Sequence, residues 1–147
     1  MKEFSHHDFA IGLPPRWIDS TVVVLVGPPN DGYSPNITVT REQLEFRLSA
    51  EEYAAEQLLA LRQGLAEQGY KVLEEGPLSL GPEGAFQRVH RFQVEEEGLR
   101  ITQLQIYLVR GGEALTITCT HRSEWFEQAR PVFMEAARTF RWREAGA

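Results

Sequence analysis

The chain of 147 residues has a single cysteine, Cys119, and no long apolar run. One cysteine cannot form a disulfide within the chain, so nothing in the sequence indicates an oxidising compartment. No segment approaches the roughly 18 apolar residues that predict a transmembrane helix. The first residues also lack the apolar core of a signal peptide. We therefore expect a cytoplasmic protein without direct membrane insertion.

Positive charge is scarce as well. The chain has 15 lysine and arginine residues against 21 aspartate and glutamate residues, which gives a formal net charge of -6. Non-specific binding to nucleic acid needs a basic surface, and so does docking on anionic lipid. We expect neither partner. With 42% apolar and 24% charged residues, the composition is typical of one globular domain, which we take to span residues 1–147.

Motifs that carry catalysis are missing from the sequence. There is no Gly-x-Ser-x-Gly element and no phosphate-binding loop. Cys119 and His121 have a spacing at which a thiol and an imidazole can pair, but Cys119 continues an apolar set, and free cysteine is usually buried. His6 and His7 have no third ligand at a useful spacing for zinc. The sequence predicts no enzyme activity, no catalytic residue, no metal and no cofactor.

The most informative segment that is present covers residues 20–26, which have the composition of a strand and are apolar on both faces. Side chains alternate across a strand, so Val22 and Val24 would lie on one face and Val23 and Leu25 on the other. A sheet with one solvent-exposed face would carry polar residues in one of these sets. The pattern predicts that both faces of this strand are covered, either within the fold or by a partner.

Alternation and turn residues predict seven strands. They cover residues 9–13, 20–26, 36–41, 71–80, 85–95, 99–109 and 114–120. Glu97-Gly98 and Gly111-Gly112 are hairpin signals between the last three strands. Because hairpins join neighbouring antiparallel strands, the predicted sheet is mostly antiparallel.

Two helices complete the predicted fold. Ser49 and Glu52 have the spacing of a capping box, and four residues at helical spacing form a buried stripe: Ala54, Leu58, Leu61 and Leu65. A second helix begins near Ser123 and runs towards Thr139. We predict an α+β fold, in which a mostly antiparallel sheet of about six to seven strands carries both helices on one face.

Two neighbouring strands each have one apolar and one polar set of side chains. The apolar sets, which we assign to the helix-covered core, are Leu104, Ile106 and Leu108, and Leu115, Ile117 and Cys119. The polar sets are Gln103, Gln105 and Tyr107, and Thr116, Thr118 and Thr120. Amides and hydroxyls beside the valines of residues 20–26 are suited to binding a ligand, while a plain solvated sheet face is the simpler interpretation.

Five segments, in their order and spacing, resemble the DcrB-like family. They are residues 9–14 (FAIGLP), 17–21 (WIDST), 36–41 (NITVTR), 103–107 (QLQIY) and 115–120 (LTITCT). The resemblance extends from about Phe4 to about Trp142 and implies the PsbP/Mog-like fold that this family shares.

One cytoplasmic branch of that family is the Eag-type chaperones of type VI secretion systems. The resemblance implies a homodimeric chaperone or adaptor that holds the hydrophobic N-terminal transmembrane segments of a secreted effector against a concave sheet face. The client-binding residues that it implies are Val22, Val24, Ile37, Val39, Gln103, Gln105 and Tyr107. The alternative is a PsbP/Mog-like, non-enzymatic binding module for a soluble protein partner.

Overall fold

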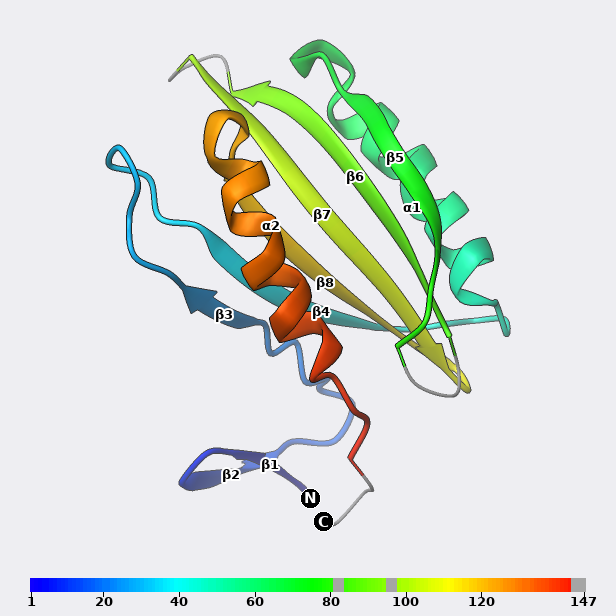
Figure 1. Cartoon of the computed structure of the whole chain (residues 1–147). Coiled ribbons are helices and arrows are strands. Elements are labelled where there is room, and N and C mark those ends of the chain that lie inside the picture. The colour runs from blue at the N-terminus through cyan, green and yellow to red at the C-terminus, as the bar shows by residue number, and fades with distance from the viewer. Residues whose placement is uncertain (81–83, 95–97, 144–147) are drawn as a thin grey trace.

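The computed structural model describes residues 1–80, 84–94 and 98–143. A six-stranded sheet with the strand order β3-β4-β8-β7-β6-β5 forms its centre, and β1 and β2 form a separate hairpin (Figure 1). The strands are β1 (Lys2–His6), β2 (Phe9–Leu13), β3 (Val23–Val26), β4 (Asn36–Gln43), β5 (Lys71–Leu78), β6 (Ala85–Val94), β7 (Leu99–Arg110) and β8 (Glu113–Arg122). The helices are α1 (Ala50–Gly64), the short 3-10 helix η1 (Ala66–Gln68) and α2 (Ser123–Arg138).

The strand pairing follows the predicted hairpins. Each neighbouring pair in the six-stranded sheet is antiparallel. Gly98 and Gly111 have positive φ angles of 63° and 61°, which glycine adopts without strain, at the start of β7 and in the turn before β8. Glu97 lies outside the described residues. The α+β class and the mostly antiparallel sheet are confirmed, although the strand predicted over residues 20–26 begins only at Val23.

The capping box of α1 forms as the sequence predicts. The Ser49 hydroxyl accepts a hydrogen bond from the backbone nitrogen of Glu52 at 3.1 Å, and the Glu52 carboxylate accepts one from the backbone nitrogen of Ser49 at 2.9 Å. These bonds satisfy two amides that the first helical turn leaves free. Of the predicted stripe, Ala54 is buried and packs in a cluster with Tyr107 of the sheet, whereas Leu58, Leu61 and Leu65 are only half-buried.

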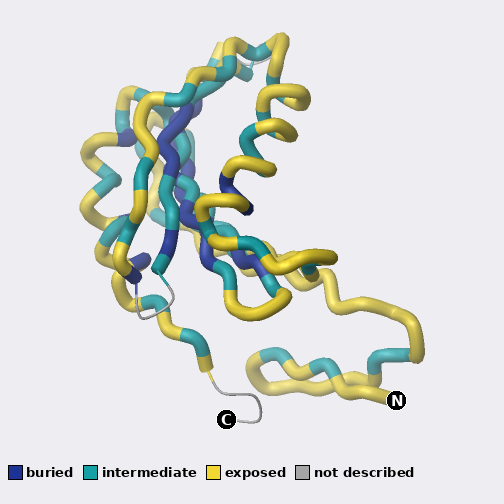
Figure 2. Tube along the Cα trace, turned by 90° about the vertical axis from the view of Figure 1, so that its right-hand side faces the viewer, coloured by how far each residue is buried: buried dark blue, intermediate teal, exposed yellow. Residues whose placement is uncertain are grey.

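The prediction that both helices cover one face is wrong. Tyr53 and Ala54 of α1 pack with Tyr107 of β7, whereas Phe126 of α2 packs in a cluster that includes Ile106 of β7. Ile106 and Tyr107 are adjacent in one strand, so they point to opposite faces of the sheet. The sheet therefore lies between the two helices, as Figure 2 shows from the side.

The physical reason is that both faces of the central strands carry apolar side chains. On the α2 face, the fully buried residues include Leu104, Ile106 and Cys119. On the α1 face, Tyr107 and Ala114 are also fully buried, and polar neighbours there bond to one another. A polar set whose hydrogen bonds are made inside the protein can be covered by a helix at low cost.

Candidate binding site at the edge of the sheet

Strand β3 is an edge strand whose side chains are exposed on both faces. In the strand order, β3 neighbours β4 alone. The exposed fractions across residues 22–26 run from 40% to 67%. Five consecutive apolar residues with this exposure form an unusual patch on the surface of a folded domain, and such patches mark interaction sites. The covering that the sequence predicts for this strand does not come from the described part of the chain.

The strand register assigns Val24 to the α1 face. Val24 pairs with Thr38, Thr38 with Thr118, and Thr118 with Gln105. Directly paired residues point to the same face of a sheet, so these four side chains form one row across β3, β4, β8 and β7. Helix α1 makes its contacts with β6 and β7. Val24 is 56% exposed at the open end of the row, and Val22, which precedes β3, is 51% exposed.

Ile37 and Val39 lie on the opposite face. They pair with Cys119 and Ile117 and pack against the core under α2. The seven residues that the resemblance implies as a client-binding set therefore do not form one surface. Val24 shares the α1 face with Gln103, Gln105 and Tyr107, whereas Ile37 and Val39 face α2. Client binding by any of them stays a prediction.

Tyr107 has no exposed surface. Its ring contacts that of Tyr53 on α1, with 6.1 Å between centroids. Its hydroxyl accepts a hydrogen bond from Nη1 of Arg88 at 2.9 Å and donates one to Oε1 of Gln105. Burial raises the pKa of this phenol above its ordinary value. A side chain enclosed in this way cannot contact a client while α1 is in place, so we leave it out of the proposed site.

The two glutamines also make their bonds within the protein. Gln105 Nε2 donates to the Thr118 hydroxyl at 3.2 Å, and Gln103 Nε2 donates to the Thr120 hydroxyl at 3.1 Å. Gln103 Oε1 accepts from His90 Nε2 at 2.8 Å. Both glutamines are half-buried. The amides predicted as ligand contacts are therefore bonded to threonine and histidine side chains of neighbouring strands.

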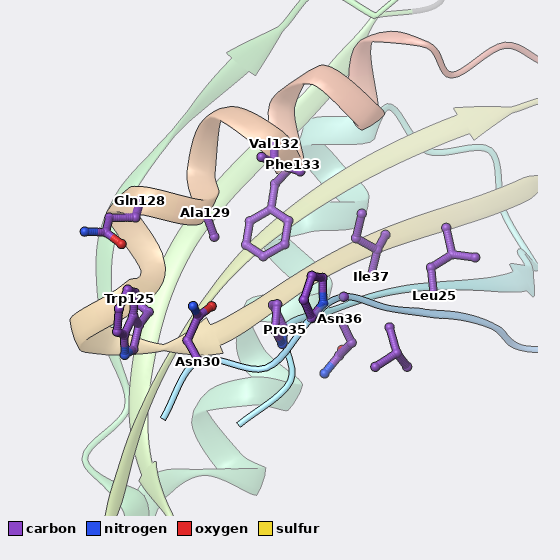
Figure 3. Close-up of a pocket in the computed structure, with 13 residues that line it drawn as sticks. Leu25, Asn30, Pro35, Asn36, Ile37, Trp125, Gln128, Ala129, Val132 and Phe133 are labelled. Carbon is purple, nitrogen blue, oxygen red and sulfur yellow. The ribbon is translucent and has the colours of Figure 1, made fainter. Parts of the chain in front are cut away.

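A groove of about 430 Å³ lies on the other face, between α2 and the segment from β3 to β4 (Figure 3). Its thirteen lining residues include no charged side chain. They are Leu25, Val26, Gly27, Pro28, Asn30, Pro35, Asn36, Ile37, Trp125, Gln128, Ala129, Val132 and Phe133. The sequence interpretation did not find this groove, although Trp125, Ala129 and Val132 recur at helical spacing and indicate an apolar face wider than the core needs.

Hydrogen bonds fix the walls of the groove. Trp125 Nε1 donates to the Asp31 carboxylate at 2.7 Å, and Arg122 Nη1 donates to the Asp31 carbonyl oxygen at 3.1 Å. His121 Nε2 donates to Oδ1 of Asn30 at 2.9 Å. These bonds tie the β3–β4 connection to the start of α2. The groove is therefore formed in advance of any ligand, which reduces the entropy lost on binding.

The thiol and the imidazole considered from sequence have separate surroundings in the structure. Cys119 is fully buried, and burial raises the pKa of its thiol to about 12. His121 Nδ1 accepts a hydrogen bond from the backbone nitrogen of Arg122, and its ring stacks with Trp125 at 6.4 Å between centroids. Within the described residues, no three His, Cys, Asp or Glu side chains gather as a metal site would require. None of the helices described is both long and apolar enough to cross a membrane.

Comparison with models of protein families identifies the family of this chain. The DcrB family model matches residues 10–139. This chain belongs to the DcrB family. A search of curated proteins finds no match to this DcrB-family protein.

Two solved structures share its fold. PA94 from Pseudomonas aeruginosa, a protein of unknown function, is 18% identical with a TM-score of 0.82, and the match covers 99% of each chain. Cyanobacterial PsbP (CyanoP) from Synechocystis sp. PCC 6803 is 10% identical with a TM-score of 0.59, and the match covers 90% of this chain and 98% of the other. The predicted PsbP-like fold is confirmed, and at these identities the likeness shows the fold alone.

Proposed function

We propose that this DcrB-family protein is a non-enzymatic binding module, a chaperone or adaptor that covers an apolar segment of a client protein. The observation that carries the proposal is the exposure of residues 22–26 on both faces of the sheet edge. Covering apolar surface is worth roughly 25 cal/mol per Å². A client that buries this patch therefore binds with a favourable free energy, because the apolar side chains of residues 22–26 leave water.

The proposed clients are the hydrophobic N-terminal transmembrane segments of a type VI secretion effector. The resemblance to Eag-type chaperones supports this choice, and so does the chemistry of the row from Val24 to Gln105. A transmembrane helix is apolar on all sides and aggregates in water. The Thr38 hydroxyl beside Val24 can pair with a small polar group on such a helix, which would otherwise be left unsatisfied.

The remaining properties of the module fit a cytoplasmic carrier. The net charge of -6 keeps a complex with an apolar client soluble. Cys119 is buried, and this burial raises the pKa of its thiol, which favours a module without thiol chemistry. The proposal includes the cytoplasm as the location and a homodimer as the working form.

A retention assay with a synthetic peptide tests this function. The probe is a leucine–alanine helix of about 20 residues with lysine at both ends, the length of a membrane span. It is mixed with the protein in detergent, the detergent is removed, and the peptide left in the supernatant is measured. The wild-type protein should retain the peptide, and the double variant Val22→Asp/Val24→Asp should lose most of this retention, because charge enters the apolar patch.

The matched control is Leu59→Asp on α1. Leu59 is 67% exposed, so this substitution also replaces an exposed apolar side chain with a charged one, but at a position away from β3. This control should retain the peptide as the wild-type protein does. Since all three positions are exposed, both variants should unfold at nearly the wild-type urea concentration. Equal retention by the double variant and the wild-type protein would rule out the proposed site.

A further inference from the structure

The two edges of the six-stranded sheet are built differently. Edge strand β5 carries Lys71, Glu74, Glu75 and Pro77, and its pairing with β6 has an irregularity after Val72. Charged residues, proline and bulges are the devices with which proteins prevent pairing at a sheet edge. Strand β3, at the other edge, is only four residues long, Val23-Val24-Leu25-Val26, but it carries no charged residue, no proline and no bulge. One edge is protected against another strand, and the other is left open.

The register shows which backbone groups of β3 are available. The Gly27 nitrogen donates to the Pro35 carbonyl oxygen at 2.8 Å, and Leu25 pairs with Ile37 in the same antiparallel ladder. Hydrogen-bonded pairs alternate along such a ladder, so the Leu25 pair is bonded to β4. The N–H and C=O groups of Val24 and Val26 therefore point to the free side, with the spacing that an incoming strand requires.

The groove lies beside this free edge. Leu25 of β3 lies at one side of it, and Trp125 and Val132 of α2 lie at another (Figure 3). Alternate side chains of a strand added to β3 would point to the α2 face, next to Leu25 and at the mouth of the groove. Recognition by strand addition combines these two elements: backbone bonds supply affinity, and pockets for alternate side chains supply specificity.

The chemistry of the site selects its occupant. The lining has no charged residue, so a charged side chain placed there would lose water without gaining a partner. A helix has already used its backbone groups and cannot bond to those of Val24 and Val26, whereas an extended segment can. We propose that the β3 edge and the groove together form a strand-addition site for an extended, uncharged and apolar segment of a partner protein. This site is additional to the proposed function, because it does not require a helical client.

Fluorescence anisotropy with a designed peptide tests the site. The probe alternates valine with threonine, carries lysine at both ends for solubility and has a fluorescein label. A second probe has the same side chains but N-methyl groups on the amides of one edge. Each amide removed costs about one hydrogen bond, so the methylated probe should bind at least about tenfold more weakly. Equal affinity of the two probes would overturn strand addition.

Variants at Val24 test the protein side. Val24→Pro removes an N–H that points to solvent and leaves the bonds to β4 in place. Val24→Thr keeps the N–H and nearly the same shape. We expect Val24→Thr to bind the unmethylated probe within about threefold of wild type and Val24→Pro at least about tenfold more weakly. If Val24→Pro binds as tightly as Val24→Thr, the edge is not the site.

Sedimentation of the protein alone shows whether the β3 edge is occupied by a second copy of the chain rather than by a strand of a partner protein. A wild-type dimer that Val24→Pro converts to monomer would show that a second copy occupies the edge, and it would overturn the proposal. Circular dichroism checks that Val24→Pro folds, and the methylated probe tests the proposal without any variant. The leucine–alanine helix offers no free backbone amides, so a failure of the methylated-probe test is distinct from a failure of the helix-retention test of the proposed function.

Discussion

Arg88 on β6 donates a hydrogen bond through Nη1 to the Tyr107 hydroxyl on β7, over 2.9 Å, beneath α1. The same guanidinium donates through Nη2 to the Ala54 carbonyl oxygen at 3.0 Å and through Nε to the Glu75 carboxylate at 3.1 Å. Arg88 is almost completely buried. One cation therefore joins α1, β5, β6 and β7, and it holds α1 on the face opposite to α2.

The first prediction follows from this arrangement. Arg88→Met keeps much of the side-chain volume but leaves the Ala54 carbonyl oxygen and the Tyr107 hydroxyl without their donor. We expect the free energy of unfolding to fall by roughly 2–4 kcal/mol, as for other broken buried networks, with little contribution from the partly exposed Glu75. Urea unfolding measures this loss.

Arg138→Met is the matched control, because Arg138 is exposed in the last turn of α2. Its unfolding free energy should stay within about 0.5 kcal/mol of the wild-type value. Equal losses for the two variants would mean that the Arg88 contacts contribute nothing beyond a surface arginine.

The second prediction concerns stability and pH. His90 is fully buried, and this burial lowers its pKa from the ordinary 6.5. The nearby positive charge of Arg88 also lowers this pKa, while the hydrogen bond between the His90 ring and Gln103 opposes the shift. As the pH falls through about 6.5, the unfolded chain binds a proton at this residue before the folded protein does. The unfolded state then binds more protons, so the free energy of unfolding decreases with falling pH. His121, whose pKa is also lowered, acts in the same direction.

Urea unfolding at pH 7.5 and at pH 5.5 measures this effect. The wild-type protein should be less stable at pH 5.5, and His90→Gln should show a smaller difference between the two pH values, because glutamine does not titrate. The glutamine variant loses some stability at both pH values, so only the difference is informative. An unchanged difference would show that His90 does not set the pH dependence.

The third prediction concerns the single thiol. Iodoacetamide alkylates thiolates, and the raised pKa and complete burial of Cys119 suppress the thiolate in the folded protein. Mass spectrometry should find the native protein unlabelled at pH 8 and labelled once in urea. Rapid labelling of the native protein would reopen thiol chemistry at Cys119 and contradict the non-enzymatic proposal.

Local features of this fold were predictable because their causes are local. The Ser49–Glu52 capping box and the turn at Gly111 depend on residues a few positions apart, and both form. The apolar alternation of Leu104 and Ile106 also identified the core correctly. Periodicity within each segment is enough for such features.

The position of α1 and the groove were not predictable in this way. The set of Gln103, Gln105 and Tyr107 indicates an open polar face, yet cross-strand bonds to threonines make it suitable for burial. The groove depends on Asp31 meeting Trp125, residues 94 positions apart in the sequence. Contacts at that separation are set by how the elements pack, which periodicity within a segment does not contain.

The central claim, that the exposed sheet edge holds apolar segments of a client, is tested most directly by photo-crosslinking in the host cell. A benzophenone amino acid replaces Val24 in one strain and Leu59 in a control strain, and the crosslinked peptides are identified by mass spectrometry. Our account predicts that the Val24 position crosslinks to one protein within apolar segments of roughly 18 or more residues, and that the Leu59 position does not. Crosslinks from Val24 only to polar, soluble segments would contradict it.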